Sequence, residues 1–188
     1  MNLVSSAIYR YFATHDDLLS ALIVDAYNDL GAAAERAARR SRAKDPRQQL
    51  QAVAGSIRHW ATANPHEYAL LYGSPVPGYE APQFTIEPAT RVTQVLADLV
   101  TAAWHDHPHA TSDRPELAMR MSMFELAALD AVMPDVPDRI RARALMVWTQ
   151  IFGFISFELF GHYVGSVRNA TAYFVVVVDE CAALVLPS

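Results

Sequence analysis

Apolar side chains recur three or four residues apart along most of this chain, and this spacing restricts its fold more than any other feature. One such stripe runs between His15 and Arg42: Leu18, Leu19, Leu22, Ile23, Ala26, Tyr27 and Leu30. The same period predicts further helices at about 46–63, 65–72, 85–105, 113–132, 137–162 and 169–186. The run Val175–Val178 favours a strand by propensity, but it has no partner strand, so we expect helix there too. The sequence therefore predicts an all-α fold.

Capping residues and prolines indicate where these helices begin. Asp45-Pro46 and Asn64-Pro65 each place a capping residue before a proline in the first turn. The segment Gly73–Pro82 contains three prolines and two glycines, which rules out regular structure. We expect it to be a connecting loop, with a gate over a pocket as the alternative.

Composition excludes several classes of protein. Apolar residues make up 52% of the chain, enough for a large core, and the net charge of -5 argues against a protein that binds nucleic acid with its whole surface. Cys181 is the single cysteine, so an internal disulfide is excluded. Because the sequence shows no secretory signal and no membrane-spanning run, we expect a cytoplasmic protein without a membrane partner.

The segment Val4–Leu19 carries the most informative local pattern. Ser5 or Ser6 can cap a short helix, and Thr14 can cap the long one that follows, with Asp17 placed to complete a capping box. A short helix with small, polar and aromatic residues, joined at a tight corner to a long helix, suits insertion into the DNA major groove.

Residues 5–19 read Ser-Ser-Ala-Ile-Tyr-Arg-Tyr-Phe-Ala-Thr-His-Asp-Asp-Leu-Leu. This run resembles the recognition helix and following turn of TetR-type bacterial transcriptional repressors. The resemblance implies a set of DNA-contacting residues: Ser5, Ser6, Tyr9, Arg10, Tyr11 and His15. His15 departs from the family, which has Lys or Arg there, so the fixed positive charge of a phosphate contact is replaced by an imidazole.

The family's DNA-binding domain has two more helices before the recognition helix, whereas Met1-Asn2-Leu3 precedes it here. We interpret this difference as a chain start placed too late, with natural loss of the DNA-reading domain as the alternative. In either case we expect this chain to bind DNA poorly or not at all. The resemblance divides the chain into a helix-turn-helix remnant with its connecting helix at 1–41 and a ligand-binding and dimerisation domain at 45–188.

The predicted helix at 137–162 is apolar nearly all round, which requires that it be covered on more than one side. Its segment Trp148–Gly161 resembles the C-terminal regulatory domain of one TetR-type subgroup. In that subgroup the last two helices pair with their copies as a four-helix bundle. The resemblance therefore implies a homodimer formed through roughly residues 137–186.

Methionine and aromatic residues on the middle helices indicate a site for a small apolar effector. Met119 and Met123 share a helix face, and methionine adapts to varied apolar ligands. The residues expected to line this site are Trp60, Tyr68, Met119, Met123, Phe124 and Gln150. The alternative is that they simply pack one another, and the volume of the site distinguishes the two interpretations.

Residues 36–44 contain a basic run, Arg36, Arg39, Arg40, Arg42 and Lys44. It is either a patch that faces phosphate groups or a set of cations that favour the negative end of a helix dipole, and the second reading is the simpler.

The motifs of common enzymes, among them Gly-x-Ser-x-Gly and His-Glu-x-x-His, are absent, so we expect no catalysis and no cofactor. The segment His105–His109 has metal-binding side chains, but Pro108 breaks their spacing, so we expect no metal. The sequence predicts a ligand-responsive repressor that binds operator DNA as a homodimer. The alternative is a dimeric protein that binds small molecules and has no role at DNA.

Overall fold

The computed structural model describes residues 11–108 and 127–186, and within these ranges it contains helices and loops but no strand. The elements are α2 (His15–Ser41), α3 (Pro46–Ala63), α4 (Pro65–Tyr72), the 3-10 helix η1 (Gln83–Thr85), α5 (Ile86–Asp106), α7 (Ala127–Val132), α8 (Asp138–Leu159) and α9 (Ala170–Val185). The predicted all-α fold is confirmed. Of the predicted helix at 113–132, only the part in α7 lies among the described residues.

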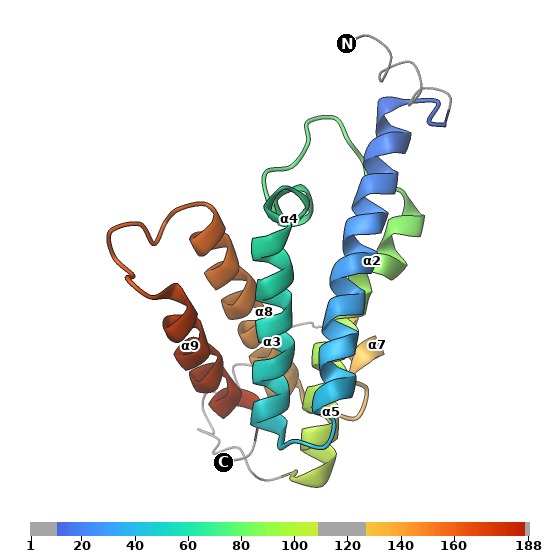
Figure 1. The fold of residues 1–188 in the computed structure, drawn as a ribbon. Coiled ribbons are helices and arrows are strands. Elements are labelled where there is room, and N and C mark those ends of the chain that lie inside the picture. The colour runs from blue at the N-terminus through green and yellow to red at the C-terminus, as the bar shows by residue number, and fades with distance from the viewer. Residues whose placement is uncertain (1–10, 109–126, 187–188) are drawn as a thin grey trace.

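Helix α2 begins where the sequence predicts, because its cap is complete. The Asp17 amide donates to the Thr14 hydroxyl over 3.1 Å, and the Thr14 amide donates to the Asp17 carboxylate over 2.9 Å. From this cap α2 runs antiparallel to α3 and packs along α5 (Figure 1). The predicted apolar stripe is wrong at Leu22, which is 49% exposed, because α3 and α5 cover the adjoining face that carries Ile23 and Ala26.

Gly31 is the point of closest approach between α2 and α5. A Cβ atom built on Gly31 would lie 2.8 Å from the Cβ atom of Arg91, closer than side chains tolerate. Close packing therefore accounts for a glycine inside a helix, where it costs about 1 kcal/mol relative to alanine.

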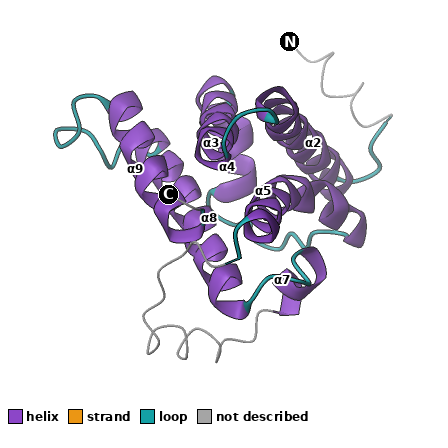
Figure 2. Cartoon of the chain, turned by 90° about the horizontal axis from the view of Figure 1, so that it is seen from below, coloured by secondary structure: helices purple, strands orange, loops and turns teal. Residues whose placement is uncertain are grey.

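Helix α3 lies at the centre of the bundle, with α2 and α5 on one side and α8 and α9 on the other (Figures 1 and 2). Its buried residues are Leu50, Val53, Ala54, Ile57, Trp60 and Ala61, all of which the period predicts. Arg58 of α3 donates two hydrogen bonds of 2.7 and 2.6 Å to the Glu158 carboxylate of α8, which fixes the two helices together.

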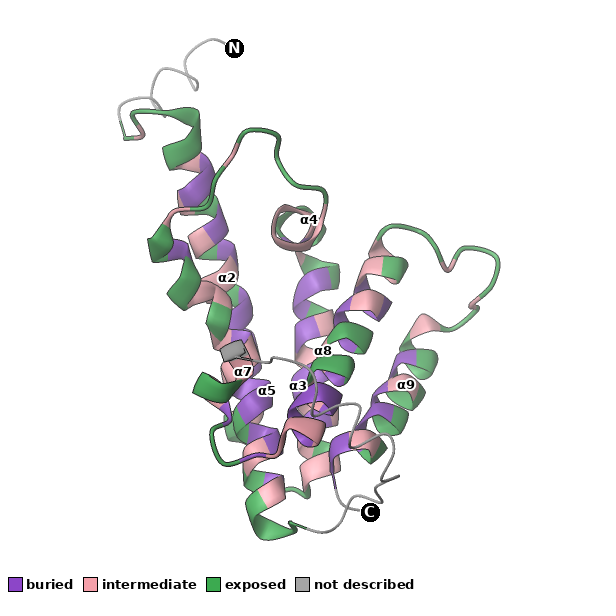
Figure 3. Ribbon diagram, turned by 180° about the vertical axis from the view of Figure 1, so that it is seen from behind, coloured by how far each residue is buried: buried purple, intermediate pink, exposed green. Residues whose placement is uncertain are grey.

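The last two helices bury one face each and leave the other in solvent (Figure 3). The valine run 175–178 lies in α9, as predicted, with Val178 buried and Val175 and Val176 exposed. On α8, Met146 and Phe157 are about half exposed, at 49% and 52%. No helix in the described ranges has the length and apolar character needed to cross a bilayer.

Candidate functional site

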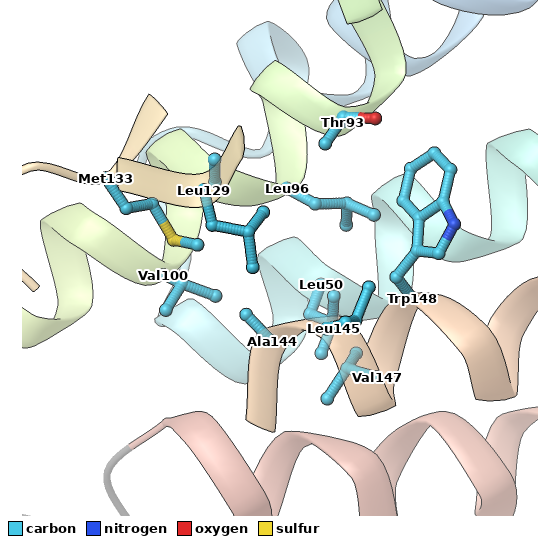
Figure 4. A pocket seen from close by; sticks show the side chains of 11 residues that line it. Leu50, Thr93, Leu96, Val100, Leu129, Met133, Ala144, Leu145, Val147 and Trp148 are labelled. Carbon is cyan, nitrogen blue, oxygen red and sulfur yellow. The ribbon is translucent and has the colours of Figure 1, made fainter. Parts of the chain in front are cut away.

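A cavity of about 230 Å³ lies between α3, α5, α7 and α8 (Figure 4). Its walls are Leu50, Thr93, Leu96, Ala97, Val100, Leu129, Met133, Ala144, Leu145, Val147 and Trp148. On α5 the spacing of Thr93, Leu96, Ala97 and Val100 places them on one helical face, so the whole of that wall comes from about two turns of helix.

The chemistry of the cavity is apolar. None of its lining residues is charged, and its polar side-chain groups are the Thr93 hydroxyl and the Trp148 indole. A packed core leaves voids hardly larger than a water molecule, so this volume favours a binding cavity over simple packing. Because drug-sized ligands occupy about 300–1,000 Å³, the cavity suits an apolar molecule smaller than most drugs.

The structure does not bring the predicted ligand-binding residues together around this cavity. Trp60 lines a separate groove between α2 and α3. Tyr68 is fully buried, and its hydroxyl lies 3.0 Å from the Phe152 carbonyl and 2.9 Å from the Ser156 hydroxyl, so its bonding capacity is already used. Gln150 is exposed on α8, because two residues beyond Trp148 is about 200° round a helix. Met119, Met123 and Phe124 lie outside the described residues.

Leu96, Met133 and Trp148 form walls that sequence reasoning did not assign to a site. The period marks Leu96 as inward but cannot tell a residue that faces a void from one that faces another side chain. Met133 is 1% exposed although it belongs to a turn. The pair Met133-Pro134 could have indicated this wall from the sequence, because a methionine in a turn often fills an irregular gap in the core.

Arg141 holds the turn that carries Met133. Its guanidinium donates to the Met133 and Pro134 carbonyl oxygens, each over 2.9 Å. It also contacts the carboxylates of Asp130 and Asp138. One buried cation thus joins the end of α7 to the start of α8, and thereby fixes one wall of the cavity.

A ladder of aromatic rings connects the cavity to α2. Trp148 stacks on Phe152 with ring centroids 4.3 Å apart, Phe152 lies 4.6 Å from Tyr72, and Tyr72 meets Tyr27 of α2 edge to face at 6.3 Å. Burial raises the pKa of the Tyr72 hydroxyl above its usual range. These four rings form a continuous series of contacts, through which a shift of the Trp148 side chain would displace the rings that touch α2.

A polar link runs from the other wall of the cavity. Arg91, two residues before Thr93 on α5, donates to the Glu35 carboxylate over 2.8 Å and to the side chain and backbone oxygens of Asn28 over 2.8 and 3.2 Å. The Arg91 guanidinium holds the pKa of Glu35 below its ordinary value of 4.5. Arg91 of α5 therefore bonds α2 at two positions, Glu35 and Asn28.

This link predicts a loss of stability in acid. Because the pKa of Glu35 is lower in the folded than in the unfolded protein, the pair stabilises the fold above about pH 4.5, and that contribution disappears as the pH falls through the folded value. We expect Glu35→Gln to lower the free energy of unfolding by about 1 kcal/mol at pH 7 and by less at pH 3.5, measured by urea unfolding. Glu80→Gln, in an exposed loop, is the control; an equal effect of both substitutions at both pH values would contradict the prediction.

The predicted DNA-contacting residues fall mostly outside the described part of the chain, namely Ser5, Ser6, Tyr9 and Arg10. Tyr11 is described and is 84% exposed, and His15 is exposed with its ring nitrogen 3.4 Å from Asp16. Within residues 11–108 and 127–186, no three His, Cys, Asp or Glu side chains are grouped as metal ligands.

Comparison with known proteins places these features in context. A family model described as "Tetracyclin repressor-like, C-terminal domain" matches residues 50–181. HTH-type transcriptional regulators of Mycobacterium tuberculosis and Mycobacterium bovis are 38% identical over 164 residues, which covers 87% of this chain and 70% of theirs.

Two solved structures have a similar fold. The crystal structure of SCO4313, described as a regulatory protein, has a TM-score of 0.71 at 28% identity and covers 94% of this chain and 77% of its own. A protein of unknown function from Rhodococcus sp. RHA1 has a TM-score of 0.67 at 20% identity, covers 98% of this chain and 80% of its own, and thus shares the fold.

Proposed function

Because this chain belongs to the tetracycline-repressor-like family of transcription regulators, we propose that it acts as a homodimeric repressor controlled by a small apolar effector. The effector site is the cavity between α3, α5, α7 and α8. The observation that carries this proposal is the position of the cavity, which has one wall on the aromatic ladder and another beside Arg91, both of which end on α2.

Helix α2 is suited to transmit a change at the cavity to DNA. It begins at His15, directly after the segment that resembles a recognition helix, and its 27 residues span about 40 Å. Tyr27 lies about 18 Å from the start of the helix, so a tilt of about 10° at Tyr27 moves that start by about 3 Å. In a dimer, such a shift alters the spacing of two recognition helices that must match successive major grooves.

The energetic requirement is differential binding. An effector that binds equally to both arrangements of α2 shifts nothing, whereas one that fits the cavity in the DNA-free arrangement favours release. Trp148 is the side chain best placed to sense the difference, because it lines the cavity and also begins the aromatic ladder.

The proposed dimer forms through α8 and α9. Met146, Gly153 and Phe157 lie on one face of α8, and Tyr173 and Val176 lie at 45% and 55% exposure on α9. Two adjacent helices with unpaired apolar faces suit a four-helix bundle between two copies.

The effector site is tested with the neutral apolar dye N-phenyl-1-naphthylamine. We expect its fluorescence to rise on saturable binding, and we expect Ala144→Phe to weaken that binding at least tenfold, because the added ring occupies the cavity. Ala102→Phe adds the same ring to an exposed position of α5 and should leave binding unchanged.

DNA binding is tested with a version of the protein as long as its relatives, which is first used to select the genomic DNA fragments that it binds. A compound that competes with the dye should release a selected fragment from the wild type but not from Ala144→Phe. Dye binding that ignores Ala144→Phe, or release that occurs equally in both proteins, would place the effector site elsewhere.

A further inference from the structure

A second and larger hollow, of about 630 Å³, lies along the α2–α3 pair, and its rim is basic. We refer to it as the α2–α3 groove, lined by Ala33, Arg36, Ala37, Arg40, Ser41, Lys44, Ala52, Ser56, His59, Trp60, Ala63 and Asn64. It shares no lining residue with the apolar cavity. In Figure 1 α3 runs side by side with the lower part of α2, the part that leads into the turn between them.

The positive charge of the groove comes mainly from one side. Arg36 and Arg40 are one turn apart on the same face of α2, and Lys44 follows in the turn to α3. His59 stands on the opposite wall, and no Asp or Glu belongs to the lining. Among the described residues, none of Arg36, Arg40 and Lys44 forms an ion pair, whereas the neighbouring Arg39 lies 3.7 Å from Glu35.

The helix dipole does not account for this arrangement. It favours cations in the last turn, and Arg39 and Arg40 are there, but Arg36 lies outside that turn. The chain has a net charge of -5, yet Arg36, Arg40 and Lys44 line one hollow without acidic partners. These three cations repel one another, and a bound anion would remove that repulsion.

We propose that the α2–α3 groove binds a small organic polyphosphate of the nucleoside di- or triphosphate class. Two guanidinium groups and an ammonium can take several phosphate oxygens at once, with the arginines in bidentate geometry. Helical positions one turn apart are separated by about 6 Å, which suits a chain of phosphates better than a single one. The small side chains of Ala37, Ala52 and Ser56 leave room for the organic part.

Size and charge separate this ligand from a nucleic acid. The volume falls within the range of about 300–1,000 Å³ that small-molecule sites occupy. Arg36 and Arg40 lie about 6 Å apart along α2, and Lys44 follows in the short turn, so the basic row is too short to follow many phosphates of a strand; the chain as a whole is acidic. This site is distinct from the proposed effector cavity, because the groove would bind a highly charged anion whereas the cavity would bind a neutral apolar molecule.

The test is calorimetric titration of the whole chain with ATP at low ionic strength. We expect saturable binding that weakens as salt is added. The double variant Arg36→Gln with Arg40→Gln should bind about a hundredfold more weakly, since each lost contact to a charged group is worth about tenfold or more. The matched control, Arg39→Gln with Arg42→Gln, removes the same charge from the same helix end outside the groove and should bind within about threefold of the wild type.

Four further titrations, with tripolyphosphate, with adenosine, of the Ala144→Phe variant with ATP, and with a single-stranded oligonucleotide, complete the design. Tripolyphosphate should compete with ATP, adenosine should not bind, and Ala144→Phe should leave ATP binding intact, which keeps this test independent of the apolar effector. Equal losses in the two double variants, absence of saturable ATP binding, or tighter binding of a single-stranded oligonucleotide than of ATP would overturn the proposal.

Discussion

Gly153→Arg is expected to convert the proposed α8–α9 dimer into a monomer at micromolar concentration, whereas Gly55→Arg leaves that dimer intact. Both glycines lie inside helices, and a Cβ atom built on either meets nothing within 4 Å, so each protomer accommodates the new side chain. Both substitutions also improve helix propensity by about the same amount, up to about 1 kcal/mol. The two variants therefore differ in what faces the glycine outside the protomer.

The expected effect at Gly153 is large because of where it lies. It stands between the exposed Gln150 and Phe157 on α8, in the middle of the face proposed to meet the second copy. In a two-fold interface each substitution occurs twice, and a buried cation without a partner costs several kcal/mol. A total of about 4 kcal/mol corresponds to an increase of about a thousandfold in the dissociation constant.

Sedimentation equilibrium of the wild type and both variants measures this effect directly. Urea unfolding of the two variants serves as the control, since it shows whether each protomer still folds. A wild type that sediments as a monomer, or a dimer that tolerates Gly153→Arg, would rule out the α8–α9 interface.

The helices could be predicted from sequence because their signals are local. Asp45 caps α3 and Asn64 precedes α4 at the positions that the Asp-Pro and Asn-Pro pairs indicate. The capping box of Thr14 and Asp17 likewise fixes the start of α2. At Leu22 the same reasoning failed, because periodicity shows which face of a helix is apolar but not how far a neighbouring helix covers it.

The site was predicted less well, because it depends on where helices distant in sequence leave a gap. Trp60, which the helical period places inward, is 8% exposed, and Tyr68 is fully buried. Yet Tyr68 is bonded to α8 and Trp60 lines the α2–α3 groove, whereas the cavity formed around Trp148. The ion pairs of Arg91 and Arg58 also join distant segments, and their spacing along the chain carries no signal of them.

Arg141→Met is expected to lower the free energy of unfolding by about 3 kcal/mol. The Arg141 side chain is only 10% exposed, and its guanidinium satisfies two carbonyl groups and two carboxylates. Methionine keeps the length of the side chain but donates no hydrogen bond, so the carbonyl of the buried Met133 loses its partner at about 1–3 kcal/mol, and the partly buried bond to Pro134 and the two carboxylate contacts are lost with it. The comparison is made by urea unfolding at pH 7 and low salt.

Two further variants separate the geometry of Arg141 from its charge. Arg141→Lys retains the charge, but the compact ammonium of lysine cannot reach the four acceptors that the planar guanidinium contacts. We therefore expect Arg141→Lys to lower the free energy of unfolding by about two thirds as much as Arg141→Met does. Arg168→Met removes an exposed arginine from the loop between α8 and α9 and should change stability by less than about 0.5 kcal/mol.

Arg141→Met also tests whether the turn that carries Met133 shapes the cavity. Arg141 bonds the backbone of Met133, whose side chain forms a wall of the cavity, so a loosened turn should weaken dye binding even under conditions where the protein remains folded. We expect Arg141→Met to weaken N-phenyl-1-naphthylamine binding at least fivefold, with Arg141→Lys between it and the wild type. If Arg141→Met lowered stability but left dye affinity unchanged, the turn would support the fold without shaping the cavity. If it changed neither, the polar contacts of Arg141 would be no stronger than those of an exposed arginine.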